Sequence, residues 1–207
     1  MTSPKRFPFT AAHLSRNDIR KEAYTFLDKY HPENTIPVPI EKIIDLKLGI
    51  NIVSIPGLRE IYNIDAYFGK DLQDIYVDEY IYRHRSNRYR FSLAHEMGHY
   101  LLHYKVYQDN NLFKTIEDWK KLVEIIPDDQ YRWLEFQAYE FGGQVLVPLH
   151  HLQERYVVQA EVVKEVQATD DPIVIKDFAI ELLAEDFSVS PEAIRRRIDN
   201  ENLPFPI

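Results

Sequence analysis

Apolar side chains recur at intervals of three and four residues along most of this chain, which predicts a mainly helical protein. The first such segment, residues 17–30, has one apolar face and Asn17 as a candidate N-cap. A short second helix is predicted to open at Val38-Pro39-Ile40 and to end before Gly49. Further helices are predicted over residues 86–107, 115–125 and 130–147, and Asp128 or Asp129 is the candidate cap of the last one. Helical periodicity then continues to the C-terminal part of the chain, with breaks near residues 170–172 and 188–191.

Three short segments between the second and third helices have a different composition. Residues 50–55, 61–68 and 74–78 are rich in Ile, Val and Tyr, and glycines at positions 57 and 69 separate them. They predict a small three-stranded antiparallel sheet. The expected fold class is therefore α+β, mainly helical, with this sheet beside the helix that begins near Ser86.

Length and composition narrow the possible functions. A chain of 207 residues accommodates one domain with a small appendage, and the absence of Cys restricts any metal site to His, Asp and Glu ligands. No apolar run approaches the roughly 18 residues of a membrane span, and none follows the first residues as a signal peptide requires. We expect a cytoplasmic protein with no membrane partner. The net charge of -8 argues against broad binding of a phosphate backbone.

Residues 95–99 read His-Glu-Met-Gly-His, which matches the H-E-x-x-H motif of zinc proteases. Residues four apart lie above one another on a helix, so His95 and His99 can bind one ion. Glu96 lies about 100° round the helix, where it can act as general base toward a water molecule at the metal. Two histidines can also share a helix face without a metal. The apolar-periodic helix around the motif, behind candidate strands, favours the metal site.

A catalytic zinc requires a third protein ligand and an open position for water. His103 lies about 12 Å along the helix axis from His95, so we expect a supporting role for it. Glu135, on a separate helix, is a better candidate, and Glu140 is the fallback one turn later. Both glutamates can equally lie on the solvent face of a core helix. Two consecutive glycines at positions 142 and 143 cost about 1 kcal/mol each in a helix, which indicates a close approach to a neighbouring element.

Three motifs together resemble the ImmA/IrrE family of zinc metallopeptidases, over about residues 17–200. The run from Arg90 to His103 resembles the family's signature around H-E-x-x-H. Pro37-Val38-Pro39-Ile40-Glu41 through Leu48-Gly49-Ile50 resembles an early P-V-x-I-E-x-I-x-x-x-L-G-I pattern. Gln137-Ala138 through Phe141, with Leu146-Val147-Pro148, resembles a second pattern close to E-x-x-A-N-x-F-A-x-x-L-L-M-P.

This resemblance implies one Zn2+ ion held by His95, His99 and Glu135, with Glu96 as the catalytic base. It places Tyr139 where the family usually has Asn or Asp, four residues after the third ligand, so Tyr139 and His103 are the candidates for supporting the metal-binding histidines. Peptidases of this kind commonly bind substrate as an extra strand at a sheet edge. The candidate edge, which can equally be an ordinary paired strand, comprises Ile75, Tyr76 and Val77.

The resemblance also implies a domain organisation and a function. We expect an N-terminal tail at residues 1–16, a metallopeptidase domain at 17–168, and a helix-turn-helix-like element with a tail at 169–207. The expected function is site-specific cleavage of a helix-turn-helix transcriptional repressor, which derepresses stress, mobile-element or phage genes. The alternative is a non-proteolytic regulator that binds DNA or a repressor and uses zinc only structurally.

Two basic clusters bear on nucleic-acid binding, which is possible but not favoured. The first is a run of arginines and tyrosines between residues 80 and 90, typical of a solvated strand and loop, although an acidic partner or single-stranded nucleic acid can also bind such a run. The second is Arg195-Arg196-Arg197, for which packing or partner docking is favoured over contact with DNA phosphates. The first cluster contains Arg83, Arg85, Arg88 and Arg90, with Tyr80, Tyr82 and Tyr89.

Overall fold

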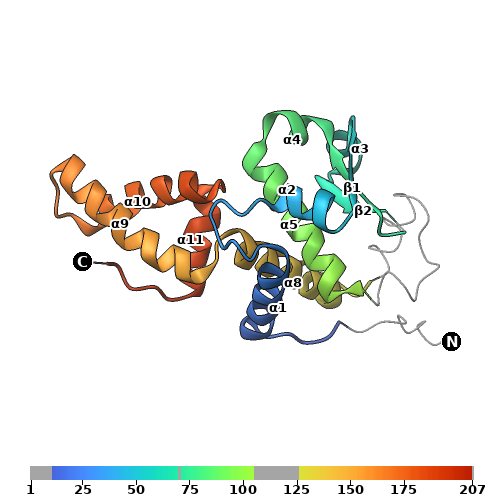
Figure 1. The fold of residues 1–207 in the computed structure, drawn as a ribbon, viewed down its shortest axis with the longest axis horizontal. Coiled ribbons are helices and arrows are strands. Elements are labelled where there is room, and N and C mark those ends of the chain that lie inside the picture. The colour runs from blue at the N-terminus through green and yellow to red at the C-terminus, as the bar shows by residue number, and fades with distance from the viewer. Residues whose placement is uncertain (1–10, 70, 105–125, 207) are drawn as a thin grey trace.

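The structure, a computed structural model, describes residues 11–69, 71–104 and 126–206. One end of the molecule contains the N-terminal helix, a small sheet and the two helices α5 and α8, and the α9–α10 hairpin extends from it as an arm (Figure 1). The described helices are α1 Arg16–Tyr30, α2 Ile40–Lys42, the π-helical η1 Ile43–Lys47, α3 Leu58–Tyr62, α4 Glu79–His84, α5 Ser86–Leu102, α8 Asp128–Leu146, α9 Leu149–Gln167, α10 Pro172–Phe187 and α11 Pro191–Asn200. The strands are β1 Asn51–Ile55, β2 Ala66–Phe68 and β3 Asp74–Asp78. The mainly helical α+β fold class is confirmed.

Helix α1 begins one residue earlier than predicted. Its N-cap is Ser15, whose side chain accepts from the backbone of Asp18 while the Asp18 carboxylate accepts from the backbone of Ser15. Asn17 therefore lies inside the first turn, because this reciprocal capping box is stronger than a single cap. The predicted apolar face is confirmed, and its buried members are Ile19, Ala23, Phe26 and Leu27.

The sheet is mixed, and the prediction of an antiparallel sheet was wrong. Strand order is β1-β3-β2, with β3 parallel to β1 and antiparallel to β2. The predicted strand at residues 61–68 begins instead with the end of helix α3, which lies between left-handed residues Gly57 and Asn63. This helix leaves only Ala66–Phe68 to pair as β2 and lets the chain return to add β3 between the two earlier strands.

The position of β3 corrects the predicted substrate edge. Ile75, Tyr76 and Val77 pair with β1 on one side and with β2 on the other, so their strand is central. Both sets of backbone hydrogen-bonding groups of β3 are used within the sheet, and an added strand has no room there. The edges of the described sheet are β1 and β2.

The arginine- and tyrosine-rich run forms helix α4 and the start of α5, not the predicted strand and loop. Each of its four arginines contacts another group of this chain, which accounts for their spacing without a bound nucleic acid. The pairs are Arg83 with Glu79, Arg85 with Tyr80, Arg88 with Asp65, and Arg90 with the carbonyl oxygens of Val38 and Ser188.

Two predicted helix ends differ from the structure, and one prediction lies outside it. Helix α5 ends at Leu102 rather than near residue 107, because His103 leaves helical geometry with φ -120° and turns its ring into the interior. Helix α8 begins at Asp128, two residues earlier than predicted, and the capping position is held by Pro127. The predicted helix at residues 115–125 lies outside the described residues.

Helices α5 and α8 pack backbone against backbone through glycine. A Cβ atom on Gly98 would lie 2.8 Å from the Cα of Ala138, and one on Gly142 would lie 3.2 Å from the backbone nitrogen of His95. His95 precedes Gly98 on α5, whereas its partner Gly142 follows Ala138 on α8, so the two helices run antiparallel. The close approach predicted from Gly142 and Gly143 is confirmed for Gly142, and it brings α8 against the helix that carries the H-E-x-x-H motif.

Replacing Gly98 with alanine is expected to destabilise the protein. The added methyl group meets the backbone of Ala138, which cannot move aside as a side chain would. Overpacking of this kind costs typically 1–3 kcal/mol, more than the roughly 1 kcal/mol that alanine gains in helix propensity. Urea denaturation measures the difference. The matched control is Gly143→Ala, whose methyl group meets only the Arg197 side chain at 3.3 Å, and an equal loss in both variants would contradict the backbone-contact argument.

The C-terminal helices join α8 through a buried arginine. Arg197 is 3% exposed, its guanidinium lies 2.6 Å from Glu201 and 3.6 Å from Glu140, and it donates to the side-chain oxygen of Gln144 at 2.9 Å. Helices α10 and α11 are joined by the three residues 188–190, with Ser190 as N-cap, so the predicted breaks and the helix-turn-helix-like pair are confirmed. The boundary between residues 168 and 169 stays a prediction. None of the described helices has the length and apolar character needed to cross a bilayer.

Candidate metal centre

Helices α5 and α8 bring three of the predicted site residues together. The Nε2 atoms of His95 and His99 lie 3.0 Å apart, and each lies 3.3 Å from a carboxylate oxygen of Glu135. Among the described residues this is the only group of three or more His, Asp or Glu side chains arranged to hold an ion. The tertiary packing therefore places Glu135 beside the two histidines, as predicted for the third ligand.

The spacing of these three side chains fits zinc. A tetrahedral ion with ligand bonds of about 2.0–2.1 Å separates its ligand atoms by about 3.3 Å. The observed separations of 3.0, 3.3 and 3.3 Å match that value, and two nitrogens with one carboxylate oxygen form a common catalytic zinc set. The residues present could therefore hold one Zn2+ ion, and all three of them line an open cavity.

The electrostatics of the group keep Glu135 ionised. Burial opposes its charge, but the adjacent imidazoles of His95 and His99 hold the pKa of Glu135 well below its ordinary value. Burial likewise disfavours charge on both histidines. For His95 the contact with Glu135 outweighs burial and raises the pKa, whereas for His99 burial prevails and lowers it. An ionised carboxylate beside imidazoles that can lose their protons is the state that binds a metal cation.

Glu96 lies next to this group without belonging to it. Its side chain is 7% exposed, it lines the cavity, and the backbone N–H of Phe68 on β2 donates to it. Burial raises the pKa of Glu96 to about 8, opposed by His95 and reinforced by the negative charge of Glu135. A cation held between His95, His99 and Glu135 adds a positive charge here, which favours the ionised form that a base requires.

His103 lies behind His99, on the side away from the cavity. It is 4% exposed, and its Nδ1 atom lies 3.0 Å from Nδ1 of His99. Its Nε2 atom lies 2.9 Å from the side-chain oxygen of Gln137, a fully buried residue of α8. Burial lowers the pKa of His103 to about 3, so its ring is neutral near pH 7. The structure thus places His103 in contact with a metal-ligand candidate, as predicted for a supporting residue.

Tyr139 and Glu140 have other roles than those considered for them. The ring of Tyr139 packs 4.7 Å from that of Phe91 and 5.0 Å from the guanidinium carbon of Arg196, and within the described residues it makes no hydrogen bond to His95 or His99. The expected support of a histidine by Tyr139 is therefore absent, because the helix turns this side chain toward the cavity wall. Glu140 points to the opposite side, where it is buried in the Arg197 network, so it cannot replace Glu135 as a ligand.

An open cavity of about 610 Å3 lies in front of the three metal-ligand candidates. Strand β2, helices α5 and α8 and the turn before α11 contribute to its wall. Tyr131, one helical turn before Glu135, lines it and is hydrogen-bonded to that carboxylate. Burial and the charge of Glu135 raise the pKa of Tyr131 to about 12, so the hydroxyl keeps its proton. Sequence reasoning missed this residue, although its position four before Glu135 was a usable signal.

A comparison with known protein families identifies the family of this chain. The family model of the IrrE N-terminal-like domain, peptidase family M78, matches residues 47–199, about three quarters of the chain. This chain belongs to that family. The resemblance to the ImmA/IrrE metallopeptidases is thereby confirmed, and the match includes every metal-ligand candidate. It also runs across the expected domain boundary at residues 168 and 169.

A solved structure adds information on the fold of this IrrE-like chain. A Mycobacterium tuberculosis transcriptional regulator is similar with a TM-score of 0.56 and 14% sequence identity, over 88% of this chain and 57% of the regulator. The chain thus spans little more than half the length of that regulator, and at this identity the similarity concerns the fold alone. No curated protein sequence matches the chain.

Proposed function

We propose that this chain is a zinc-dependent endopeptidase that cleaves a protein substrate at a specific site. The observation that carries the proposal is the convergence of His95, His99 and Glu135 at mutual distances of 3.0–3.3 Å, with Glu96 beside them at the cavity. Membership in a metallopeptidase family supports the same class of reaction.

Glu96 performs the proton transfers in this proposal. Zinc, when bound, polarises the scissile carbonyl and makes a water molecule acidic enough to be used near neutral pH. Glu96 accepts a proton from that water as it attacks the carbonyl and donates it to the departing amine. The backbone N–H of Phe68 holds the Glu96 carboxylate toward the cavity, so that one side chain can serve both steps.

Tyr131 is our candidate for stabilising the negative charge that develops on the carbonyl oxygen. Its hydroxyl keeps its proton, lies at the cavity wall and contacts Glu135. A neutral hydroxyl at this wall can donate a hydrogen bond to the charge that develops in the transition state.

The peptide substrate is proposed to bind along β2. This strand is an edge of the described sheet, and all three of its residues line the cavity. An extended peptide can add to such an edge through backbone hydrogen bonds, which supply affinity for many sequences. Contact between β2 and Glu96 then places the scissile bond beside the catalytic base.

A helix-turn-helix transcriptional repressor is the proposed substrate, and its cleavage in the cytoplasm would derepress the genes that it controls. The family relationship and the fold shared with a transcriptional regulator support a role in gene control. A repressor encoded beside the gene of this protein is the first substrate to test.

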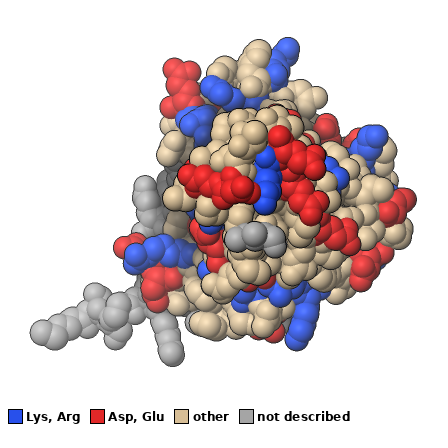
Figure 2. Space-filling model, turned by 90° about the vertical axis from the view of Figure 1, so that its left-hand side faces the viewer, with Lys and Arg blue, Asp and Glu red and all other residues tan. Residues whose placement is uncertain are grey.

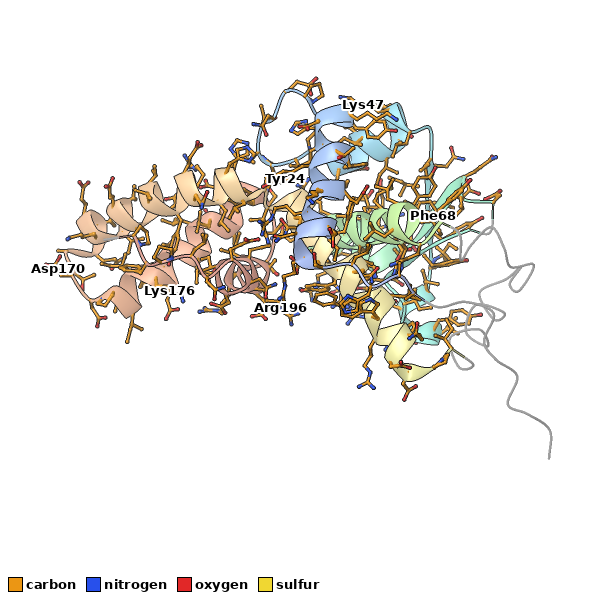
Figure 3. All side chains as sticks on the ribbon, turned by 90° about the horizontal axis from the view of Figure 1, so that it is seen from below. Tyr24, Lys47, Phe68, Asp170, Lys176 and Arg196 are labelled. Atoms are coloured by element: carbon orange, nitrogen blue, oxygen red, sulfur yellow. The ribbon has the colours of Figure 1, made fainter. Side chains whose placement is uncertain are left out.

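Charge distribution supports a protein substrate over direct nucleic-acid binding. Residues 149–187 contain nine Asp or Glu and three Lys or Arg, and Figure 2, which views the molecule from the end of the arm, shows acidic side chains over this face. Figure 3 shows Asp170 at the tip of the arm and Arg196 where the C-terminal helices meet the rest of the protein. The three arginines at 195–197 each pair with an acid: Arg195 with Asp177, Arg196 with Glu192, and Arg197 with Glu201.

Replacing Glu96 with glutamine tests the proposal. The variant is expected to bind zinc in the same stoichiometry as the wild type but to lose cleavage of a co-purified repressor by at least about 10²–10⁴-fold, because the amide cannot accept the proton. Metal content is measured by elemental analysis, and cleavage by mass spectrometry of the products.

Glu79→Gln is the matched control, since Glu79 pairs with Arg83 at the surface and should affect neither quantity. Undiminished cleavage by the Glu96 variant would remove Glu96 from the mechanism. Stoichiometric zinc in a wild-type protein that cleaves no repressor would favour the alternative, a regulator with structural zinc.

A further inference from the structure

An extended segment before α1, residues 11–13, lies on helix α8. The main-chain oxygen of Ala12 accepts two hydrogen bonds, from the indole of Trp133 at 3.1 Å and from the amide of Gln137 at 2.6 Å. Two further contacts hold the segment: the ring of His13 stacks on Trp133 with centroids 4.4 Å apart, and the backbone nitrogen of Ala11 donates to Gln130 at 2.9 Å. Residues 130, 133 and 137 share one helix face, so the segment follows α8 toward the metal-ligand candidates.

The carbonyl of Ala12 determines how Gln137 is oriented. A carbonyl oxygen only accepts hydrogen bonds, so the amide NH2 of Gln137 faces Ala12 and the amide oxygen faces His103. The amide oxygen of Gln137 can likewise only accept a hydrogen bond, so the proton of His103 must be on Nε2. The assignment rests on donor and acceptor chemistry, because a flipped amide would set two acceptors against each other at 2.6 Å.

The orientation of Gln137 then determines the tautomer of His99. His103 is buried and has no acidic partner among its hydrogen bonds, so a charged ring is disfavoured there. A neutral imidazole carries one proton, so Nδ1 of His103 is an acceptor and Nδ1 of His99 must be the donor across their 3.0 Å contact. Nε2 of His99 is left with its lone pair toward the ion position, as metal binding requires, and in the metal-free protein it can accept from Nε2 of His95 at 3.0 Å.

We propose that Gln137 is a positioning residue of the metal centre: anchored by the Ala12 carbonyl, it fixes the tautomer of His99 through His103. The inference rests on the metal site of the proposed function. It assigns the segment at residues 11–13 a role in that site, although the segment contributes no ligand to it. The opposite tautomer would point an N–H at the ion position and would have to rearrange before binding.

The first test uses the wild-type protein without metal and needs no variant. Long-range 1H–15N NMR spectra distinguish the two neutral tautomers of each imidazole. We expect the proton on Nε2 in His103 and on Nδ1 in His99. A proton on Nδ1 of His103, or on Nε2 of His99, overturns the proposal. Because neither substrate nor zinc is present, this result is separate from success or failure of the protease assignment.

The second test replaces Gln137 with leucine, which has a similar volume but no polar atoms. We expect His99 to lose its single tautomer and the dissociation constant for zinc, measured by competition with a chelator, to rise by about 10–100-fold. The matched control is Trp133→Phe, which keeps the aromatic ring and removes only the other donor to Ala12, so both quantities should stay at wild-type values. Wild-type zinc affinity in a folded Gln137→Leu variant would contradict the proposal. If the Gln137→Leu variant fails to fold, the tautomer spectra of the wild-type protein decide whether the proposal holds.

Discussion

Glu135→Gln is expected to abolish stoichiometric zinc binding. The amide removes the negative charge of the third ligand and replaces one of its two oxygens with an NH2 group, which cannot coordinate a metal ion. The loss should exceed the roughly 10–100-fold that follows removal of a residue in contact with a ligand, because a ligand itself is lost. Chelator competition and elemental analysis measure it, and peptidase activity should disappear together with the metal.

The control for this prediction is Glu140→Gln on the same helix. Glu140 faces the Arg197 network, 3.6 Å from the guanidinium, so its replacement should lower stability while zinc affinity stays unchanged. If Glu140→Gln lost zinc and Glu135→Gln retained it, the assignment of the third ligand would be wrong by about one helical turn.

Arg197→Met is expected to cause the largest loss of stability among substitutions outside the site. The variant removes the buried cation shared by Glu140 and Glu201, whose side chains are both about 5% exposed, and leaves each with one more exposed arginine, Arg16 or Arg20. Removing one member of a buried ion pair typically costs about 3–5 kcal/mol. Urea denaturation measures the free energy of unfolding, and because Arg197 joins α11 to α8, detachment of the C-terminal helices should precede loss of the rest.

Arg195→Met is the matched control for the buried arginine. Arg195 pairs with Asp177, but both side chains are about half exposed, so the change should cost at most about 1 kcal/mol.

The pH dependence of stability gives a second check on the Arg197–Glu201 pair. Burial opposes the charge of Glu201, but Arg197 lowers its pKa below the ordinary 4.5, so the stability from this pair is present above pH 4.5 and is lost as the pH falls further. The difference between wild type and Arg197→Met should therefore shrink in acid.

Much of the helical framework was predictable because helices are local structures. The repeat of apolar residues located α1, α5 and α8 to within a few residues, and the Asp-Pro and Ser-Pro pairs located the starts of α10 and α11. Errors at helix ends arose where a particular side-chain interaction set the end, as the Ser15–Asp18 capping box did at α1 and as burial of the His103 ring did at α5.

The sheet was predicted less well, because strand pairing is not local. Residues 51–55 pair with a strand more than 20 positions away, and the apolar pattern of a strand is the same whether its partner runs parallel or antiparallel. The short segment 61–68 could equally form helix or strand, and its first two residues ended in α3. The predicted substrate edge was wrong for the same reason, since edge status depends on the spatial order of the strands, and β3, the last of the three in sequence, lies between β1 and β2.

The placement of His95, Glu96 and His99 on one helix, at the spacing that zinc proteases use, could be read from the residue pattern, because that spacing depends only on helix geometry. The choice of Glu135 over Glu140 as the residue that meets the two histidines required the packing of the folded chain. So did the placing of Tyr131 and of the Ala12–Gln137–His103 contacts around them. These groups are distant in sequence, and their meeting depends on how closely α5 and α8 approach at Gly98 and Gly142.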